Sequence, residues 1–326
     1  MQSVARTPYP NLLDLIGNTP MVRLDKLCAN PNVTLLGKLE CYNPSFSIKD
    51  RIVAHIIQQA IKSRKITSDT TIVEASSGNT ASSVAMLAAR HDLKSIITLP
   101  DTTSIEKIQL AKLYGATIVL CPHAVSSDSP DHYVNKALSI AAVTPNSFIL
   151  DQYNNPLNIE AHYHFTAKEI LDQTHHEVDY IVGCASTGGT MSGIGRYVKA
   201  HLPSTQIIIA DSQASIFKAN FNGNQPNPEE IKSTIIEGAG KSYLPGCMMM
   251  QYVDDIISVT DEQAVETLYR AARQEGLCLG LSASLALFVS LALIEKEEFS
   301  RPTTIVTVLA DSGLKYLSKL ADIDHR

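Results

Sequence analysis

The sequence of 326 residues contains no tryptophan, and aromatic residues make up only 6% of it. It also has no basic tract and no long acidic tail. Its 27 Lys and Arg residues against 33 Asp and Glu residues give a formal charge of −6. This charge balance argues against nucleic acid or an anionic membrane surface as the main partner.

Disulfide and membrane signals are absent as well. The six cysteines show no Cys-x-x-Cys spacing, and a chain of this length can fold without disulfides, so we expect reduced, buried thiols. The first eleven residues lack the apolar segment of a secretion signal, and the most apolar stretch, residues 281–294, is too short to span a bilayer. These features predict a soluble cytoplasmic protein that does not bind membranes.

The hydrophobic pattern predicts an α/β protein. Short β-rich runs at residues 71–74, 94–99 and 117–120 each precede a helical stretch, and the same alternation resumes at residue 180. Strands that alternate with helices form mostly parallel sheets flanked by helices. We therefore expect two such lobes, joined near residues 144–158. Residues 217–233, rich in Asn, Pro and Gly, are predicted to form a long surface loop.

Four predicted strand-to-helix junctions are rich in Gly, Ser, Thr and Asn, and ligands of parallel sheets bind at such turns. One of them, Cys-Ala-Ser-Thr-Gly-Gly-Thr at residues 184–190, combines small residues with a helix N-terminus, which favours a phosphate. It matches neither a P-loop nor a Gly-x-Gly-x-x-Gly pattern. The junction therefore indicates a small phosphorylated ligand, although a plain tight turn has the same local sequence.

A second junction, Pro-Ser-Phe-Ser-Ile-Lys-Asp-Arg at residues 44–51, places Lys49 in the first turn of a predicted helix. The positive end of a helix and a partly apolar setting both lower the pKa of a lysine, which frees its amine to attack a carbonyl and form a Schiff base. An isolated lysine at a helix start is usually a solvated surface charge. The functional interpretation of Lys49 therefore depends on the other junctions.

The remaining junctions offer further donors. Residues 74–80, Glu-Ala-Ser-Ser-Gly-Asn-Thr, are suited to a carboxylate or to a simple N-capping turn. Residues 280–284 resemble a Gly-x-Ser-x-Gly nucleophile turn, but Ser284 replaces the second glycine and no His/Asp pair accompanies it, which argues against a serine hydrolase. The histidines lack the spacing of metal ligands, so we expect no metal site.

Taken in order, these junctions, with Ile-Gly-Asn-Thr-Pro at residues 16–20 and Asp-Ser-Gly-Leu-Lys-Tyr-Leu-Ser at residues 311–318, resemble the cysteine synthase and cystathionine β-synthase family. These are fold-type II pyridoxal phosphate enzymes with a tryptophan synthase β-like architecture. The resemblance implies a small mobile lobe at residues 45–150, which carries the substrate-carboxylate loop. It also implies a large cofactor-binding lobe made of residues 1–44 and 151–326.

The same resemblance implies pyridoxal 5′-phosphate as the cofactor, with Lys49 binding it covalently and later moving the α-proton. Asn79 would hold the ring hydroxyl, and Ser282 would face the pyridine nitrogen. A hydroxyl at that place makes the ring a weaker electron sink, which favours loss of a β-substituent over transamination. The cofactor phosphate would be bound by Ser186, Thr187, Gly188, Gly189 and Thr190. The substrate would be bound by Ser76, Ser77, Asn79, Thr80, Gln152 and Gly238.

The implied reaction is β-replacement on O-acetylserine or serine with sulfide or a thiol, through an aminoacrylate, to give cysteine or cystathionine. Three alternatives stay open: replacement on O-phosphoserine with an amine to give a diaminopropionate precursor, dehydration of serine or threonine, and a catalytically idle binding scaffold. The sequence departs from the family pattern at Ser76, usually Thr, at Ala81, usually Gly, and at Ser186, where the cup usually begins with Gly. Since relatives are commonly homodimers, we expect a homodimer that acts on small amino acids.

Overall fold

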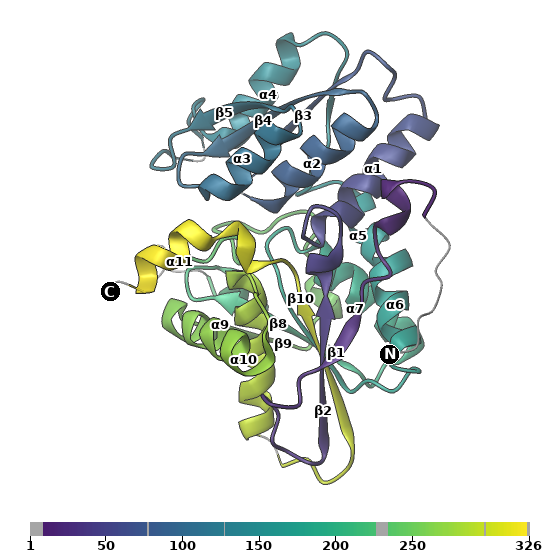
Figure 1. Ribbon diagram of the computed structural model, residues 1–326, viewed down its shortest axis with the longest axis vertical. Coiled ribbons are helices and arrows are strands. Elements are labelled where there is room, and N and C mark those ends of the chain that lie inside the picture. Colours follow the sequence, from purple (N-terminus) through teal and green to yellow (C-terminus); the bar gives the residue numbers. More distant parts are fainter. Residues whose placement is uncertain (1–8, 77, 127, 226–233, 297, 325–326) are drawn as a thin grey trace.

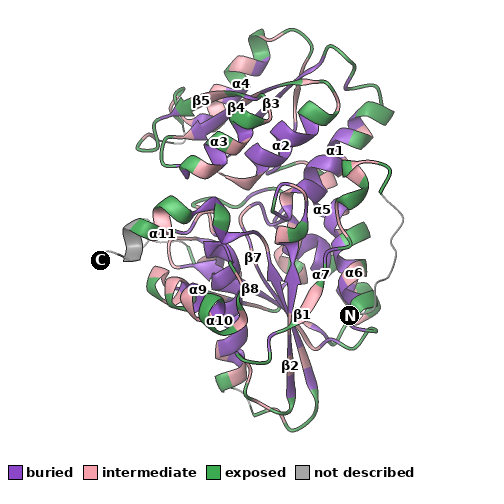
Figure 2. Cartoon of the chain, in the orientation of Figure 1, coloured by how far each residue is buried: buried purple, intermediate pink, exposed green. Residues whose placement is uncertain are grey.

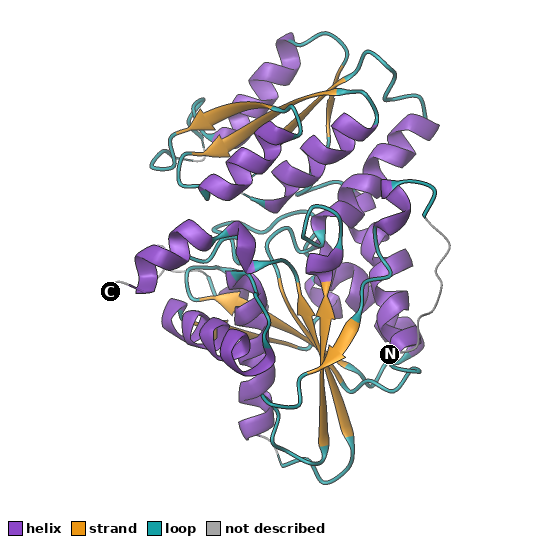
Figure 3. Ribbon diagram, viewed as in Figure 1, coloured by secondary structure: helices purple, strands orange, loops and turns teal. Residues whose placement is uncertain are grey.

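The structure is a computed structural model that describes residues 9–76, 78–126, 128–225, 234–296 and 298–324. Within these residues the chain forms two lobes, each built on its own sheet (Figure 1). Figure 3 shows strands in the middle of each lobe and helices on both sides of them. The predicted α/β class with two mostly parallel, helix-flanked sheets is therefore confirmed.

The smaller lobe contains a parallel four-stranded sheet in the order β5-β4-β3-β6. Its central strand β3 is buried along its whole length, as expected of a parallel strand covered on both faces. The core of this lobe also includes Ile52 and Ile56 of α1. Its strands are β3 (Thr71–Ala75), β4 (Lys94–Pro100), β5 (Thr117–Cys121) and β6 (Ser147–Ile149). Its helices are α1 (Lys49–Lys62), α2 (Asn79–Arg90), α3 (Ile105–Leu113) and α4 (Tyr133–Val143).

The larger lobe contains a six-stranded sheet in the order β1-β2-β10-β7-β8-β9. Only β1 runs antiparallel to its neighbour, so the carboxyl ends of the other five strands lie at one edge of the sheet. That edge faces the smaller lobe (Figure 1). The strands are β1 (Met21–Arg23), β2 (Val33–Leu39), β7 (Tyr180–Cys184), β8 (Gln206–Ser212), β9 (Asp255–Val259) and β10 (Thr303–Leu309).

Helices cover both faces of this sheet. Helices α9 (Asp261–Glu275) and α10 (Leu281–Lys296) lie on one face, and α5, α6 and α7 lie on the other (Figure 1). Helix α10 is apolar on nearly all sides because it is enclosed between the sheet and α9, and Figure 2 shows it largely buried. The other helical segments are η1 (Leu12–Leu15), η2 (Glu40–Tyr42), α5 (Pro156–Ala161), the π-helix η3 (His162–Thr166), α6 (Ala167–Gln173), α7 (Gly189–His201), α8 (Phe217–Phe221), η5 (Met250–Tyr252), η6 (Gly313–Lys315) and α11 (Leu317–Asp324).

The structure corrects one detail of the sequence prediction. The expected surface loop at residues 217–233 begins with the short helix α8, because Phe217 is fully buried and anchors the segment in the core. Residues 226–233 of that loop lie outside the described residues. Among the residues that are described, no helix has both the length and the apolar character needed to cross a membrane.

Candidate active site

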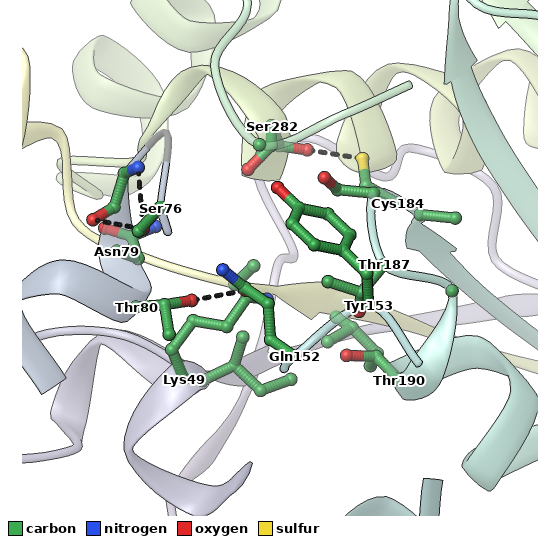
Figure 4. A pocket seen from close by; sticks show the side chains of 18 of the residues that line it. Lys49, Ser76, Asn79, Thr80, Gln152, Tyr153, Cys184, Thr187, Thr190 and Ser282 are labelled. Atoms are coloured by element: carbon green, nitrogen blue, oxygen red, sulfur yellow. Dashed lines mark hydrogen bonds between the residues drawn. The ribbon is translucent and has the colours of Figure 1, made fainter. Parts of the chain in front are cut away.

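A pocket lies where the carboxyl ends of the strands in the larger sheet meet the smaller lobe. Figure 4 shows side chains from both lobes around it, including Lys49 and Thr80 from one lobe and Cys184 and Ser282 from the other. The lining residues are Ile48, Lys49, Ser76, Gly78, Asn79, Thr80, Lys107, Gln152, Tyr153, Cys184, Ala185, Ser186, Thr187, Gly188, Thr190, Gly238, Ser282, Val308 and Ala310. This set contains two lysines and no carboxylate.

Lys49 is the first residue of α1, and its two neighbours hold it in place. Asp50 accepts hydrogen bonds from the backbone N–H of Ser45 at 2.7 Å and from the hydroxyl of Ser83 at 2.6 Å. Arg51 is buried, and its guanidinium binds Glu40 at 2.6 and 2.8 Å and Glu169 at 2.6 and 2.7 Å. Because Asp50 and Arg51 are fixed in this way, the first turn of α1 can aim Lys49 at the pocket.

The environment of Lys49 favours a neutral amine. Burial lowers the pKa of its ammonium, while the nearby Asp311 opposes that shift in part. His162 is also completely buried, and burial together with the charges of Lys49 and Arg51 keeps the pKa of its imidazole well below the ordinary value. His162 is therefore neutral, and one ring nitrogen lies 3.1 Å from the hydroxyl of Thr190 at the edge of the pocket.

The turn before α7 is shaped to receive an anion. Its N-cap residue Gly188 has φ +85°, a left-handed conformation that favours glycine, and α7 has no acidic residue in its first turn. A Cβ on Gly188 would lie 2.5 Å from the Cα of Met248, and one on Gly189 would lie 2.1 Å from Oδ1 of Asn158. Only glycines fit here. The N–H of Gly189 donates to the hydroxyl of Thr187 at 3.3 Å, and the N–H groups that follow it in the first turn are left for an anion.

Asn158 and Gln152 connect this turn to the smaller lobe. The amide nitrogen of Asn158 donates to the hydroxyl of Thr187 at 3.0 Å and to the backbone carbonyl of Gln152 at 2.8 Å. The side-chain oxygen of Gln152 accepts a hydrogen bond from Thr80 at 2.6 Å, and its amide nitrogen donates to the carbonyl of Ala75 at 3.0 Å. One chain of hydrogen bonds therefore runs from the α7 turn to the α2 turn, and Figure 4 shows the bond between Thr80 and Gln152 in it.

The turn before α2 offers a second set of donors. The hydroxyl of Ser76 accepts hydrogen bonds from the backbone N–H groups of Gly78 at 3.1 Å and Ala81 at 3.2 Å. The N-cap residue Gly78 has no side chain to occupy the remaining N–H groups, and the first turn of α2 carries no acidic residue. Like the α7 turn, this helix end is therefore open to an anion.

Residues near the end of the chain hold Asn79. Its amide nitrogen donates to Asp311 at 2.6 Å, and its amide oxygen accepts from Lys315 at 3.1 Å. Tyr316 donates to the same oxygen of Asp311 at 2.6 Å. Burial lowers the pKa of Lys315 to about 8, although Asp311 and Asp50 oppose the shift. These contacts fix the orientation of the Asn79 amide at the edge of the pocket.

Ser282 lies on the opposite wall, in the first turn of α10. The thiol of Cys184, at the end of β7, donates to the backbone carbonyl of Ser282 at 2.8 Å (Figure 4). Burial keeps the pKa of the Cys184 thiol far above its ordinary value, so this group stays protonated and can donate. The bond ties the start of α10 to the end of β7 and places Ser282 against the pocket.

The structure brings together most of the residues predicted from the sequence. Ser77 lies outside the described residues, and Gly189 does not line the pocket because the side chain of Asn158 packs against it. Among side chains that can form hydrogen bonds, sequence reasoning missed four: Lys107, Tyr153 and Cys184, which line the pocket, and Asn158, which contacts the α7 turn. Cys184 could have been predicted, because it follows a predicted strand at a junction that binds ligands. Lys107 and Asn158 lie in ordinary helical sequence, which does not distinguish them from other helical residues.

The comparisons with known proteins decide the family. Residues 12–311 match the family described as "Pyridoxal-phosphate dependent enzyme". The chain belongs to this family. Its cofactor is therefore pyridoxal phosphate, and the resemblance read from the motifs is confirmed.

Three similar proteins narrow the relationship within the family. The chain is 37% identical over 309 residues to a cystathionine β-synthase of Dictyostelium discoideum, covering 95% of this chain but only 61% of that protein. It is 36% identical to cysteine synthase B of Campylobacter jejuni, covering 95% and 97% of the two chains. The crystal structure of an O-acetylserine-dependent cystathionine β-synthase from Helicobacter pylori superposes with a TM-score of 0.86 at 30% identity, covering 96% and 98%.

The pocket fits the cofactor of the family. The α7 turn suits a phosphate. Its glycines are packed too closely for any side chain, and its free N–H groups can bind an anion. An aldehyde needs a primary amine of lowered pKa, and Lys49 supplies one inside the pocket. Asn79 and Ser282 add polar groups suited to the substituents of a pyridine ring. The donor set therefore agrees with pyridoxal phosphate.

Proposed function

We propose that this protein catalyses β-replacement on an activated L-serine, O-acetylserine or serine, with sulfide or a thiol as the acceptor. The observation that carries the proposal is the position of Lys49, a buried amine between two anion-receptive helix ends. Of these, the α7 turn matches the cofactor phosphate and the α2 turn matches an amino-acid carboxylate. The names of the cysteine synthase and cystathionine β-synthase relatives support this reaction and not the alternatives considered from the sequence.

The residues would divide the binding of the cofactor and the donor. Lys49, Asn79, Ser282 and the turn from Ser186 to Thr190 would hold the cofactor. Ser76, Asn79, Thr80, Gln152 and Gly238, together with Ser77, would hold the donor amino acid. The bound cofactor supplies an electron sink next to the α-carbon of the donor.

The protein groups act around that sink. The neutral amine of Lys49 takes the proton from the α-carbon of the donor, because its lowered pKa leaves it free to accept one. The electrons of that C–H bond expel the β-substituent, which leaves with the electron pair of its C–O bond. The thiolate of the acceptor then forms the new C–S bond at the β-carbon, and Lys49 returns its proton to the α-carbon. The donors of the α2 turn hold the carboxylate, and the two lobes together exclude water that would otherwise compete with the acceptor.

We also propose that residues 45–150 move as the small lobe against residues 1–44 and 151–326, which would let the donor enter and then enclose it. Hydrogen bonds that cross the lobes near the pocket, such as Thr80 to Gln152 and Asn79 to Asp311, support this assignment. They are the contacts that opening would break. Hydrogen exchange measured with and without the donor would test it.

The homodimer and the cytoplasmic location remain part of this proposal. Tyr42, Phe46 and Leu314 are large apolar side chains that are 66%, 43% and 54% exposed, which suits an interface between two copies. All six cysteines are free thiols, which suits a reducing compartment. Light scattering on the purified protein would report the oligomeric state.

The function is tested by the visible absorption spectrum of the purified protein and of Lys49→Ala, recorded before and after adding O-acetylserine or serine. We expect a cofactor band that depends on Lys49 and shifts with the true donor, and replacement product once a thiol is added. Lys112→Ala, at an exposed position on α3, is the matched control and should behave as the wild type. A band that no donor shifts, or release of pyruvate without coupling to any thiol, would overturn the proposal.

A further inference from the structure

A cluster of polar and aromatic residues lies behind one wall of the pocket and has no role in the function proposed above. It is formed by His132 and Tyr133 at the start of α4, by Tyr153, and by Lys241 and Tyr243 in the segment that follows Gly238. Tyr153 lines the pocket itself, so the cluster is joined directly to the site. It draws residues from both lobes and is complete only when they are together.

Lys241 is the cation of this cluster. Its ammonium lies over the ring of Tyr153, 4.9 Å from the ring centroid, and it forms a hydrogen bond with Tyr133. The hydroxyls of Tyr133 and Tyr153 lie 3.4 Å apart, and the ring of Tyr243 packs edge-on against Tyr153. Tyr133 and Tyr153 are only 8% and 7% exposed. The ammonium therefore lies against two buried phenols.

The cluster contains donors and lacks an acid. Within the residues that the structure describes, no ion pair involves Lys241, whereas Lys107, which lines the pocket, pairs with Glu237 at 2.5 Å. Asp151 is close enough to act on Tyr243 but is not paired with Lys241. Nδ1 of His132 is buried and has no hydrogen-bond partner. A half-buried cation without an acid and an unpartnered ring nitrogen are groups that an anion would satisfy, and the two phenol hydroxyls beside them are further donors.

The other anions of the reaction already have matching sites. The α7 turn suits the cofactor phosphate, and the α2 turn suits the carboxylate of the donor, so neither needs Lys241. Sulfide has no carboxylate and would make no use of the cluster. An organic acceptor that enters along Tyr153 would bring a carboxylate toward Lys241 while its sulfur points into the pocket.

We propose that Lys241, together with the hydroxyls of Tyr133 and Tyr153, binds the carboxylate of the second substrate, so that the acceptor is a carboxylate-bearing thiol and not sulfide. This proposal rests on the β-replacement proposed above. It assigns Lys241 a role in acceptor specificity and none in binding the cofactor or the donor.

The kinetic test compares four acceptors at a saturating concentration of the donor: sulfide, the neutral 2-mercaptoethanol, 3-mercaptopropanoate and homocysteine. In Lys241→Gln we expect KM for the two carboxylate-bearing thiols to rise about 10-fold or more, the loss typical of a charge-assisted hydrogen bond. KM for sulfide and for 2-mercaptoethanol should stay near the wild-type values. Lys241→Arg keeps the charge and should restore most of the discrimination. Lys112→Gln removes one exposed charge elsewhere and is the control.

A binding measurement separates this proposal from the reaction itself. Calorimetry on the holoenzyme would compare 3-(methylthio)propanoate, which carries the carboxylate but cannot attack, with 2-(methylthio)ethanol. We expect only the carboxylate to bind the wild type and Lys241→Arg, and its binding to be lost in Lys241→Gln. Equal binding to all variants, no binding to the wild type, or an equal rise of KM for all four acceptors would overturn the proposal. If the wild type formed no product with any of the four acceptors, the replacement reaction itself would be wrong. Calorimetry would then still show whether Lys241 binds a carboxylate.

Discussion

The α7 turn in the larger lobe and the α2 turn in the smaller lobe are both strand-to-helix junctions with open N–H groups, yet they are built differently. The α7 turn is shaped by packing, since Gly188 and Gly189 have no room for a Cβ. The α2 turn is shaped by polar contacts, since the Ser76 hydroxyl accepts hydrogen bonds from two of its N–H groups. A Cβ on Gly78 would come closest to the flexible end of Lys107, at 3.2 Å. A turn held by packing suits a permanently bound cofactor, and one held by exchangeable hydrogen bonds suits a substrate that comes and goes.

The largest effect should come from a methyl group added to the packed turn. In Gly189→Ala the new Cβ would collide with Asn158, which is itself buried, so we expect cofactor affinity to fall about 100-fold and stability to fall by about 3 kcal/mol. Absorption titration with pyridoxal phosphate and urea denaturation would measure both. Gly78→Ala is the matched change in the other turn, where φ is 172° and no strain arises; it should keep affinity within about threefold. Similar losses in both variants would remove the distinction between the turns.

Acid should weaken the ion pair between Arg51 and Glu169, which joins the two lobes away from both turns. Arg51 belongs to α1, whereas Glu169 belongs to α6 of the larger lobe. Burial tends to raise the pKa of Glu169, but Arg51 and Lys38 outweigh it and lower the pKa from 4.5 to about 2. The contribution to stability is therefore complete above pH 4.5 and is lost as the pH falls toward 2, with an upper bound of about 3 kcal/mol.

Glu169→Gln isolates that contribution from the titration of other carboxylates. Urea midpoints of the wild type and the variant should differ clearly at pH 7 and converge only as the pH falls to about 2, since both proteins share every other titrating group. If the two urea midpoints differed by the same amount at every pH, the ionised form of Glu169 would not be the source of the stability difference.

A smaller effect is expected at the residue that links the two turns. Gln152→Met keeps the size of the side chain but removes its hydrogen bonds to Thr80 and Ala75. We expect KM for the donor amino acid to rise about 10-fold, because two buried polar groups lose their partners, while cofactor affinity changes little. Steady-state kinetics and the absorption titration together would measure this split. A parallel loss of cofactor affinity would mean that the two turns act as one unit.

The smallest effect should follow changes at Ser76. Ser76→Ala removes the acceptor for two backbone N–H groups and should cost about 1 kcal/mol, with a rise of about threefold in donor KM. Ser76→Thr keeps the hydroxyl and restores the residue usual in relatives, so it should match the wild type. If threonine were as damaging as alanine, the space around Ser76 would matter more than its hydroxyl.

The residues around Lys49 could be predicted because their signals are local. A β-rich run followed by small residues and a helical pattern located β3-α2 and β7-α7, and parallel strands bring such turns to one edge. The short strand β1 and the strand β2 carried no comparable signal, because their helical neighbours lie far away along the chain. Other contacts could not be predicted, because they join segments that only the tertiary structure brings together. These are the ion pairs of Arg51 with Glu40 and Glu169, and the cluster of Tyr133, Tyr153 and Lys241.

Strand β10 is the last strand in the described part of the chain, yet it lies between β2 and β7 near the middle of the larger sheet. During synthesis, every strand of the smaller sheet has left the ribosome well before β10 is made. The smaller lobe can therefore collapse while the larger one still has a gap at its centre. A nascent chain stalled before residue 303 would expose the edges of β2 and β7, and the arrival of seven residues would close both at once.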